Sequence, residues 1–339
     1  MNSEAPSAPV TRLEVLGRLD PDEVAAVALL VERATEVDGV RPLSEHVVLH
    51  LRYGGDAPAL NVLAYRSAVL VGYAHLDTTD EVAGASAELV VDPAHRGAGL
   101  GRHLVEAALA GTSDGRLRLW THGGHAAAAS LAASMGFTKI RELWQMRRSL
   151  RGELPPARWP QAVAVRTFVP GRDEDAWVAL NARAFADHPE QGALDRDDLD
   201  RRMHEPWFDP AGFFLAYRSD DADVGGAGGA GGAGGAGGES TDRTGGERLV
   251  GFHWTKVHGG GPGEHGHDPI GEVYVVGVDP DAQGGGLGRA LTLIGLEHLR
   301  KRGLPQVLLY VDADNTAAIR VYRGLGFTRW DTDVMYGRG

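Results

Sequence analysis

The chain has 339 residues, of which 43% are hydrophobic and 24% charged, as expected for a globular protein of two ordinary domains. A formal net charge of −12 argues against binding to nucleic acid or an anionic membrane surface, and the lack of cysteine excludes disulfides, thiolate metal ligands and a cysteine nucleophile. Residues 1–9 have no apolar leader and no apolar run is long enough to span a membrane, so we expect a cytoplasmic protein.

Hydrophobic periodicity in the first half predicts alternating strands and helices. Strands are expected at residues 11–18, 61–66, 68–77, 85–91, 116–121 and 138–148, and helices at 20–37, 100–110 and 126–134. The segment that follows contains three prolines and suits a linker. We therefore predict a first domain at 1–150, a linker at 151–162 and a second domain at 163–339.

The second half repeats this order of elements. Strands are expected at 162–168, 213–218 and 248–257, and helices at 173–185 and near 196–203. A Gly-Gly-Ala repeat at 225–238 has almost no side chains to bury and predicts a flexible loop without a chemical role. A later loop holds His258, His265 and His267, which suits either a solvated turn or a metal site.

Residues 272–289, EVYVVGVDPDAQGGGLGR, form the most informative stretch. Its first part is an apolar strand that ends at Asp279-Pro280, with Glu272, Tyr274 and Val276 expected on one face. A glycine-rich turn follows, and then the start of an amphipathic helix. Because the first N–H groups of a helix have no partner and glycine lets a ligand approach them, this arrangement favours binding of a phosphate.

The spacing of the turn excludes two common phosphate sites. Arg289 stands where a dinucleotide fingerprint needs its third glycine, and no Lys-Ser/Thr pair follows, as a P-loop requires. The segment from Gln283 to Gly288 instead resembles the pyrophosphate loop, Q/R-x-x-G-x-G/A, of the GCN5-related N-acetyltransferases. That resemblance implies a mixed-sheet α/β fold that binds acetyl-coenzyme A. A tight strand-to-helix turn without a ligand is the structural alternative.

The loop occurs twice in register. Ala85 to Pro93 followed by Arg96 to Arg102 matches Glu272 to Pro280 followed by Gln283 to Arg289. The offset is 187 residues at the prolines and 190 at Phe137 and Phe327, in the two Gly-Phe-Thr segments farther on. Two tandem copies of one acetyltransferase domain are the simplest explanation.

Acetyl transfer to an amine needs a base for the amine and an acid for the departing thiolate. Glu272 leads an otherwise apolar strand, where a carboxylate is costly unless it is used, so we assign it as the base; a solvated strand-entry glutamate is the alternative. Residues 312–327 resemble the family pattern D-x-x-N-x-x-A-x-x-x-Y-x-x-x-G-F, and its tyrosine, Tyr322, is our candidate acid rather than a core residue. The first copy has Ala85 and Ala132 at these two positions and His125 at that of Asn315.

A closer resemblance covers nearly the whole chain. The segments FADHPEQG at 185–192, GFHWTK at 251–256 and EVYVVGVDP at 272–280 are similar to those of the actinobacterial tandem acetyltransferases that acetylate the cysteinyl amine of a glucosaminyl-inositol conjugate, the last step of mycothiol synthesis. In that family both halves can hold acetyl-coenzyme A while only the second reacts. The chain departs from the pattern in its Gly-Gly-Ala insert and its histidine-rich loop.

The resemblance also implies the contacts of each half, with no metal and a monomeric protein. Cofactor contacts in the first half would be Leu89, Val90, Val91, Gly97, Ala98, Gly99, Leu100, Gly101 and Arg102. Those in the second half would be Val276, Gly277, Val278, Gln283, Gly284, Gly285, Gly286, Leu287, Gly288, Arg289, Asn315, Thr316, Ala317, Ala318, Ile319 and Arg320. Substrate contacts would be Glu45, Glu190, Lys256, Glu272 and Tyr310.

Two other functions remain open at this point. A tandem acetyltransferase of this kind could act on an aminoglycoside, a polyamine or a protein N-terminus, because spacing alone does not name the acceptor. The second alternative is a non-enzymatic acetyl-coenzyme A sensor. The presence of both Glu272 and Tyr322 in one copy argues against it.

Overall fold

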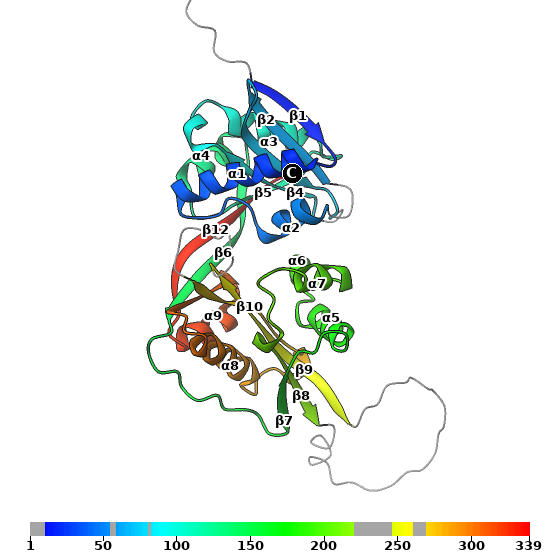
Figure 1. Cartoon of the computed structure of the whole chain (residues 1–339), viewed down its shortest axis with the longest axis vertical. Coiled ribbons are helices and arrows are strands. Elements are labelled where there is room, and N and C mark those ends of the chain that lie inside the picture. The colour runs from blue at the N-terminus through cyan, green and yellow to red at the C-terminus, as the bar shows by residue number, and fades with distance from the viewer. Residues whose placement is uncertain (1–10, 55–58, 81–82, 220–245, 260–268) are drawn as a thin grey trace, which may run out of the picture. The chain divides into compact units, whose positions relative to one another are not determined.

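The computed structural model describes residues 11–54, 59–80, 83–219, 246–259 and 269–339. The insert at 225–238 and two residues of the later loop, His265 and His267, lie outside these ranges. The chain forms two compact units (Figure 1). Unit 1 comprises residues 1–145, 311–316 and 329–339, and unit 2 comprises residues 146–310 and 317–328.

Unit 1 is built on a mixed sheet. The strands are β1 (Thr11–Leu16), β2 (Ala59–Arg66), β3 (Val69–Asp77), β4 (Ala85–Val91), β5 (Leu117–Thr121) and β12 (Thr328–Arg338), in the order β1-β2-β3-β4-β5-β12. All neighbours are antiparallel except β4 and β5, which are parallel. The last strand of the chain therefore completes the sheet of unit 1.

Helices cover both faces of this sheet. The helices are α1 (Pro21–Asp38), α2 (Glu45–Tyr53), α3 (Leu100–Ala110) and α4 (Ala126–Ser134). Val27, Leu30 and Val47 of α1 and α2 pack with Tyr73 and Val90 on one face. On the other face, apolar side chains of α3 and α4 pack against β2 to β5. The sheet is thus the middle of three layers.

Unit 2 repeats this architecture. Its strands are β7 (Val163–Thr167), β8 (Phe213–Ser219), β9 (Glu247–His258), β10 (Ile270–Val278) and β11 (Gln306–Asp312), in the order β11-β10-β9-β8-β7. Its helices are α5 (Glu174–Ala184), α6 (Pro189–Gly192), α7 (Arg196–Met203), α8 (Leu287–Lys301) and α9 (Thr316–Gly324). The chain changes from one unit to the other within β6 (Thr138–Ser149), within β11, at the start of α9 and at the start of β12.

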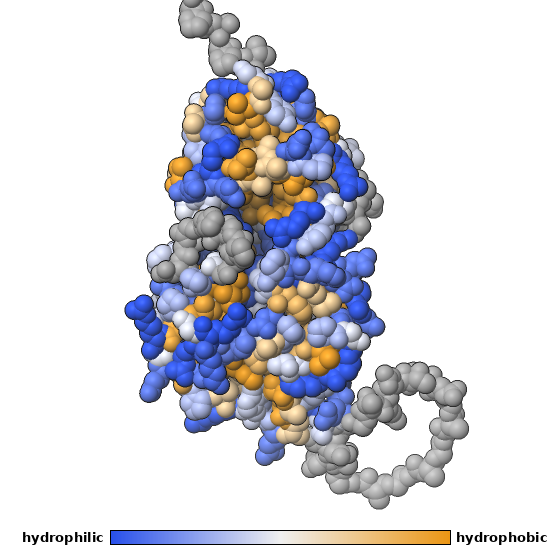
Figure 2. Space-filling view, viewed as in Figure 1, coloured by the Kyte–Doolittle hydropathy of each residue, from blue (hydrophilic) through white to orange (hydrophobic). Residues whose placement is uncertain are grey.

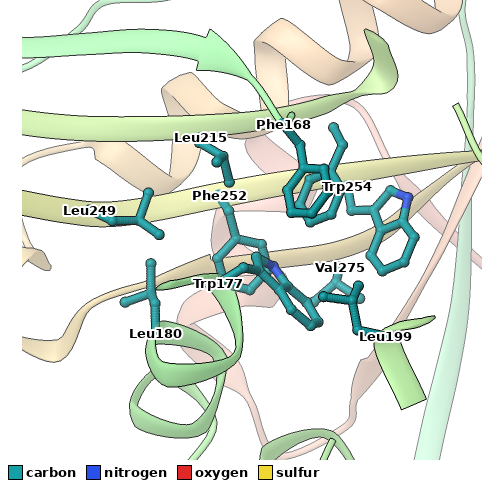
Figure 3. Packing of buried hydrophobic residues seen from close by; sticks show 10 residues of the cluster. Phe168, Trp177, Leu180, Leu199, Leu215, Leu249, Phe252, Trp254 and Val275 are labelled. Carbon is teal, nitrogen blue, oxygen red and sulfur yellow. The ribbon is translucent and has the colours of Figure 1, made fainter. Parts of the chain in front are cut away.

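An aromatic core holds α5 and α7 against the sheet of unit 2 (Figure 3). The Trp177 ring of α5 meets Phe213, Phe252 and Trp254 edge-on at centroid distances of 5.4–5.8 Å. Phe213 also stacks on Trp254 at 4.5 Å. Edge-to-face and offset rings combine large apolar burial with a defined geometry, so this face of β8 to β10 is a rigid platform.

Local sequence signals explain most of these elements. Helix α1 starts with a capping box between Asp20 and Glu23, followed by Pro21, and ends at Gly39 with a φ of 71°. Helix α2 was not predicted from the sequence, although Ser44 caps it and Gly54 ends it. The predicted mixed-sheet α/β fold is confirmed.

The surface carries mixed polarity. On the face shown in Figure 2, apolar and hydrophilic residues are interspersed. Large apolar side chains exposed in the described ranges include Val37 and Trp330, which are 67% and 65% exposed. No helix in the described part of the chain is long and apolar enough to cross a membrane.

Candidate active site

Both glycine-rich turns have the same geometry. Gly99 and Gly286 are the N-cap residues of α3 and α8, each with a φ of 83°, and neither cap is closed by a side-chain hydrogen bond. Gly97 and Gly284 also have positive φ, 74° and 85°. Only glycine adopts this backbone without strain, and the arrangement exposes the first N–H groups of each helix. Each turn is therefore suited to an anion such as a pyrophosphate.

An aspartate fixes each turn to the end of its strand. The carboxylates of Asp92 and Asp279 accept the N–H groups two residues on, at 2.9 Å and 3.0 Å, across the following proline. Their own N–H groups donate to the carbonyls of Val71 and Val250, both at 2.9 Å. Arginines of the covering helices complete the anchor, because Arg33 and Arg183 lie 2.9 Å and 3.0 Å from Asp92 and Asp279.

Parallel strands separate beside each turn. The register of β10 with β11 comprises Gly271↔Val307 and Glu272↔Leu308, and that of β4 with β5 ends at Ala87↔Leu119. Both pairs thus part toward their carboxyl ends, which is where ligands bind in open α/β sheets. Three predicted cofactor residues, Val276, Gly277 and Val278, lie on β10 beyond the last pair.

Glu272 is the last residue of β10 that pairs with β11. It is 7% exposed, and its Oε2 lies 2.6 Å from Nε2 of His258, the last residue of β9. Opposite Glu272 in the antiparallel register is Lys256, which is 8% exposed. The Lys256 ammonium lies over the rings of Trp207 and Tyr274, 4.2 Å and 5.1 Å from their centroids. The structure therefore brings a predicted base and a predicted substrate residue together.

A β-bulge changes the predicted faces of β10. The register with β9 shifts between Val273 and Val275, so one extra residue, Tyr274, stands in the strand. Tyr274 and Val275 consequently both pack with the α5–α7 core, whereas Val276 packs with α8. The expectation that Glu272, Tyr274 and Val276 share a face is wrong for Val276, because strict alternation does not survive a bulge.

Other predicted residues lie in several elements. Tyr322 of α9 is partly buried with its ring 5.8 Å from that of Phe327, and burial raises the pKa of its phenol to about 12. Tyr310 of β11 is 43% exposed. Glu190 belongs to the short helix α6, and Glu45 to the first turn of α2 in unit 1. Residues 316–320 begin α9, with Ile319 as its buried residue.

Unit 1 contains a buried charged cluster that the sequence did not reveal. The ring of His122, after β5, lies 3.0 Å through Nδ1 from Asp333 of β12 and 3.5 Å through Nε2 from Glu88 of β4. Glu88 also accepts the N–H of Ser44 at 2.5 Å, and Asp333 that of Gly123 at 2.9 Å. This cluster, Glu88–His122–Asp333, spans the place where β4 and β5 part.

The pKa values in the cluster move in opposite directions. Burial disfavours the charged imidazolium, but the two carboxylates outweigh it and raise the pKa of His122 from 6.5 to about 10. Burial also opposes ionisation of Glu88, yet the hydrogen bonds from His122 and Ser44 hold its pKa below 4.5. The charged forms of both residues are thus favoured in the folded protein.

Known protein families match both halves of the chain. The model of the acetyltransferase (GNAT) family matches residues 179–327, and that of an acetyltransferase (GNAT) domain matches residues 58–139. The mycothiol acetyltransferase of Streptosporangium roseum is 65% identical over 96% of this chain and 98% of its own. That of Acidothermus cellulolyticus is 54% identical over 97% and 95%. The chain belongs to the mycothiol acetyltransferase family.

Solved structures support the fold of this mycothiol acetyltransferase family member. A GCN5-related N-acetyltransferase from Sphaerobacter thermophilus superimposes with a TM-score of 0.64 at 24% identity, over 96% of this chain and 95% of that one. A tandem GNAT protein from the clavulanic acid biosynthesis pathway gives 0.67 at 19% identity, over 97% and 98%. The predicted tandem acetyltransferase fold and the predicted family are both confirmed.

The buried cluster of unit 1 generates a stability prediction. His122→Gln leaves two buried carboxylates without their cation, and breaking a buried ion pair in this way costs about 3–5 kcal/mol. Because the folded pKa of His122 is raised, its contribution is complete below pH 6.5 and is lost as the pH rises through about 10. Urea unfolding of both proteins from pH 6 to 10, followed by circular dichroism, should show the difference shrinking as the pH rises.

The exposed His103→Gln on α3 is the matched control and should unfold like the wild type. A constant difference between His122→Gln and the wild type across the pH range would contradict the assigned ionisation of His122.

Proposed function

We propose that this chain transfers an acetyl group from acetyl-coenzyme A to the cysteinyl amine of the cysteinyl-glucosaminyl-inositol conjugate desacetylmycothiol, forming mycothiol and coenzyme A. The family membership supports the acceptor, because the relatives are named mycothiol acetyltransferases. The observation that carries the proposal is the position of Glu272, a buried carboxylate at the point where β10 and β11 part, on the strand that leads into a glycine-rich turn.

The chemistry assigns one step to each of two side chains. An ammonium cannot attack a thioester, so Glu272 accepts its proton and leaves a neutral amine. The amine then attacks the thioester carbonyl, and the amide bond forms as the carbon–sulfur bond breaks. The nitrogen also loses its second proton, which replaces the one given to the thiolate. Tyr322, whose raised pKa keeps the phenol protonated, donates to the departing thiolate. Acetyl-coenzyme A supplies the activated acetyl group when bound.

The acceptor side supports a polar, cationic substrate. Glu272 supplies a carboxylate close to Lys256, whose ammonium can donate to hydroxyl groups of a sugar or an inositol. Glu190 and Tyr310 complete the proposed substrate contacts of unit 2. The rings of Trp207 and Tyr274 hold the Lys256 ammonium in a fixed place.

Two acetyl-coenzyme A molecules per chain follow from the same argument. The turns at Gly99 and Gly286 are equally open, so we propose that each half binds a cofactor. Catalysis is assigned to the half at 163–339, because Ala85 and Ala132 of the first half carry no proton-transfer group. Residues 1–150 then act as a non-catalytic binding half.

The acceptor is identified by a panel of amines. Purified protein is incubated with acetyl-coenzyme A and desacetylmycothiol, an aminoglycoside, a polyamine or a peptide. Because the favoured acceptor carries its own thiol, coenzyme A and the acetylated product are measured by chromatography and mass spectrometry rather than by a thiol reagent. Rapid turnover of another amine instead would replace the proposed acceptor, and cofactor binding without turnover would favour the sensor.

Glu272→Gln tests the base. The amide keeps the size of the side chain and cannot take the proton, so kcat should fall by roughly 10²–10⁴ while acetyl-coenzyme A affinity stays near normal. Rates with desacetylmycothiol and calorimetric titration with acetyl-coenzyme A measure the two effects. Glu297→Gln, on the exposed side of α8, is the control. Equal rates for Glu272→Gln and the wild type would remove Glu272 from the mechanism.

Gly99→Leu and Gly286→Leu separate the two halves. Both glycines have a φ of 83° and no heavy atom within 4 Å of a built Cβ, so the backbone strain is matched. Gly286→Leu should abolish turnover, whereas Gly99→Leu should remove one bound acetyl-coenzyme A and spare turnover. Calorimetry counts the sites and chromatography measures the rate. Loss of catalysis in a folded Gly99→Leu protein would contradict this division of labour.

A further inference from the structure

His258 occupies a position between a buried carboxylate and the surface. It closes β9 and pairs with Ile270 of β10, two residues before Glu272. Its Nε2 lies 2.6 Å from Oε2 of Glu272. The His258 side chain is 33% exposed, whereas that of Glu272 is 9% exposed. The imidazole therefore contacts one oxygen of a buried carboxylate while remaining partly exposed itself.

Lys256 also lies next to Glu272 in the sheet, but its ammonium is directed toward two aromatic rings. These are the rings of Trp207 and Tyr274. The Tyr274 hydroxyl in turn accepts a hydrogen bond from Arg202 Nε at 2.9 Å. The Glu272 carboxylate contacts His258 at 2.6 Å.

We propose that His258 is a positioning residue for Glu272. An ionised carboxylate only accepts hydrogen bonds, so the proton of this contact is on His258 Nε2, which donates to Oε2. That bond fixes the rotation of the carboxylate and leaves Oε1 to accept the proton of the acceptor amine. The arrangement is a base held by a third group, as in other catalytic pairs of a base and its orienting residue.

The inference rests on the proposed role of Glu272 as base, and two substitutions test it. His258→Leu removes the donor, and kcat should fall by roughly tenfold to a hundredfold, the range known for residues that orient metal ligands. The KM for acetyl-coenzyme A should stay unchanged. His258→Gln keeps an N–H donor that can reach the carboxylate and should recover most of the lost rate. A role in packing alone predicts no such recovery by glutamine over leucine.

A double substitution separates this inference from the proposed function. In a protein that already carries Glu272→Gln, His258→Leu should have no further effect on kcat, because the two residues act as a unit. Full additivity, or equal kcat in His258→Leu and the wild type, would overturn the positioning role while leaving Glu272 as the base. Failure of Glu272→Gln to slow the reaction would instead overturn the proposed function.

Two controls keep the result interpretable. His204→Leu replaces a histidine of the same unit whose Nδ1 contacts the Asp200 carbonyl at 2.7 Å, and its kcat should match the wild type. Circular dichroism and calorimetric binding of acetyl-coenzyme A establish that each His258 variant is folded. If His258→Leu does not fold, the comparison of His258→Gln with the wild type decides, because a rate lost by more than tenfold there contradicts the proposal.

Discussion

The separation of two parallel strands is the constraint on which each half depends. Each hydrogen bond between two strands pairs an N–H group of one strand with a C=O group of the other. Where the strands separate, these N–H and C=O groups need other partners. In both halves the parting strand is followed by an aspartate that ties the strand to a glycine-rich turn and to an arginine of the covering helix. Strand, turn and helix are thus fixed as one piece around the site.

The two halves differ in what fills the gap between the strands. In unit 1, Glu88 and His122 face each other there, and the β3–β4 register runs unbroken from Asp77↔Ser86 to Gly72↔Val91. In unit 2 the bulge at Tyr274 breaks the register, and an apolar residue, Val275, follows it. The two halves therefore place their carboxylates differently: Glu88 lies just beyond the last β4–β5 pair and faces His122, whereas Glu272 lies at the last β10–β11 pair and contacts His258.

The sequence predicted the bounds of helices and strands correctly where a hydrophobic pattern fitted only one kind of element. Strand β4 and helices α3, α4 and α7 have the bounds that periodicity predicted, and both turns lie at the predicted helix starts. The bulge in β10 was not predictable, because its apolar residues fit either face. From the sequence, His258 was assigned to a loop that suits either a solvated turn or a metal site, whereas it ends β9; its contact with Glu272 depends on strand pairing across fourteen residues. Asp333 likewise reaches His122 only through tertiary structure.

The pairing of β12 with β5 has a consequence for biosynthesis. The strand follows residues 146–310 in the chain, and it brings Asp333 to the imidazole of His122. Domains usually fold in order as they emerge. Here the sheet of unit 1 gains its final strand only after residues 146–310 have been made. A nascent chain must therefore hold the first unit incomplete while residues 146–310 are made, with the edge of β5 open until β12 emerges.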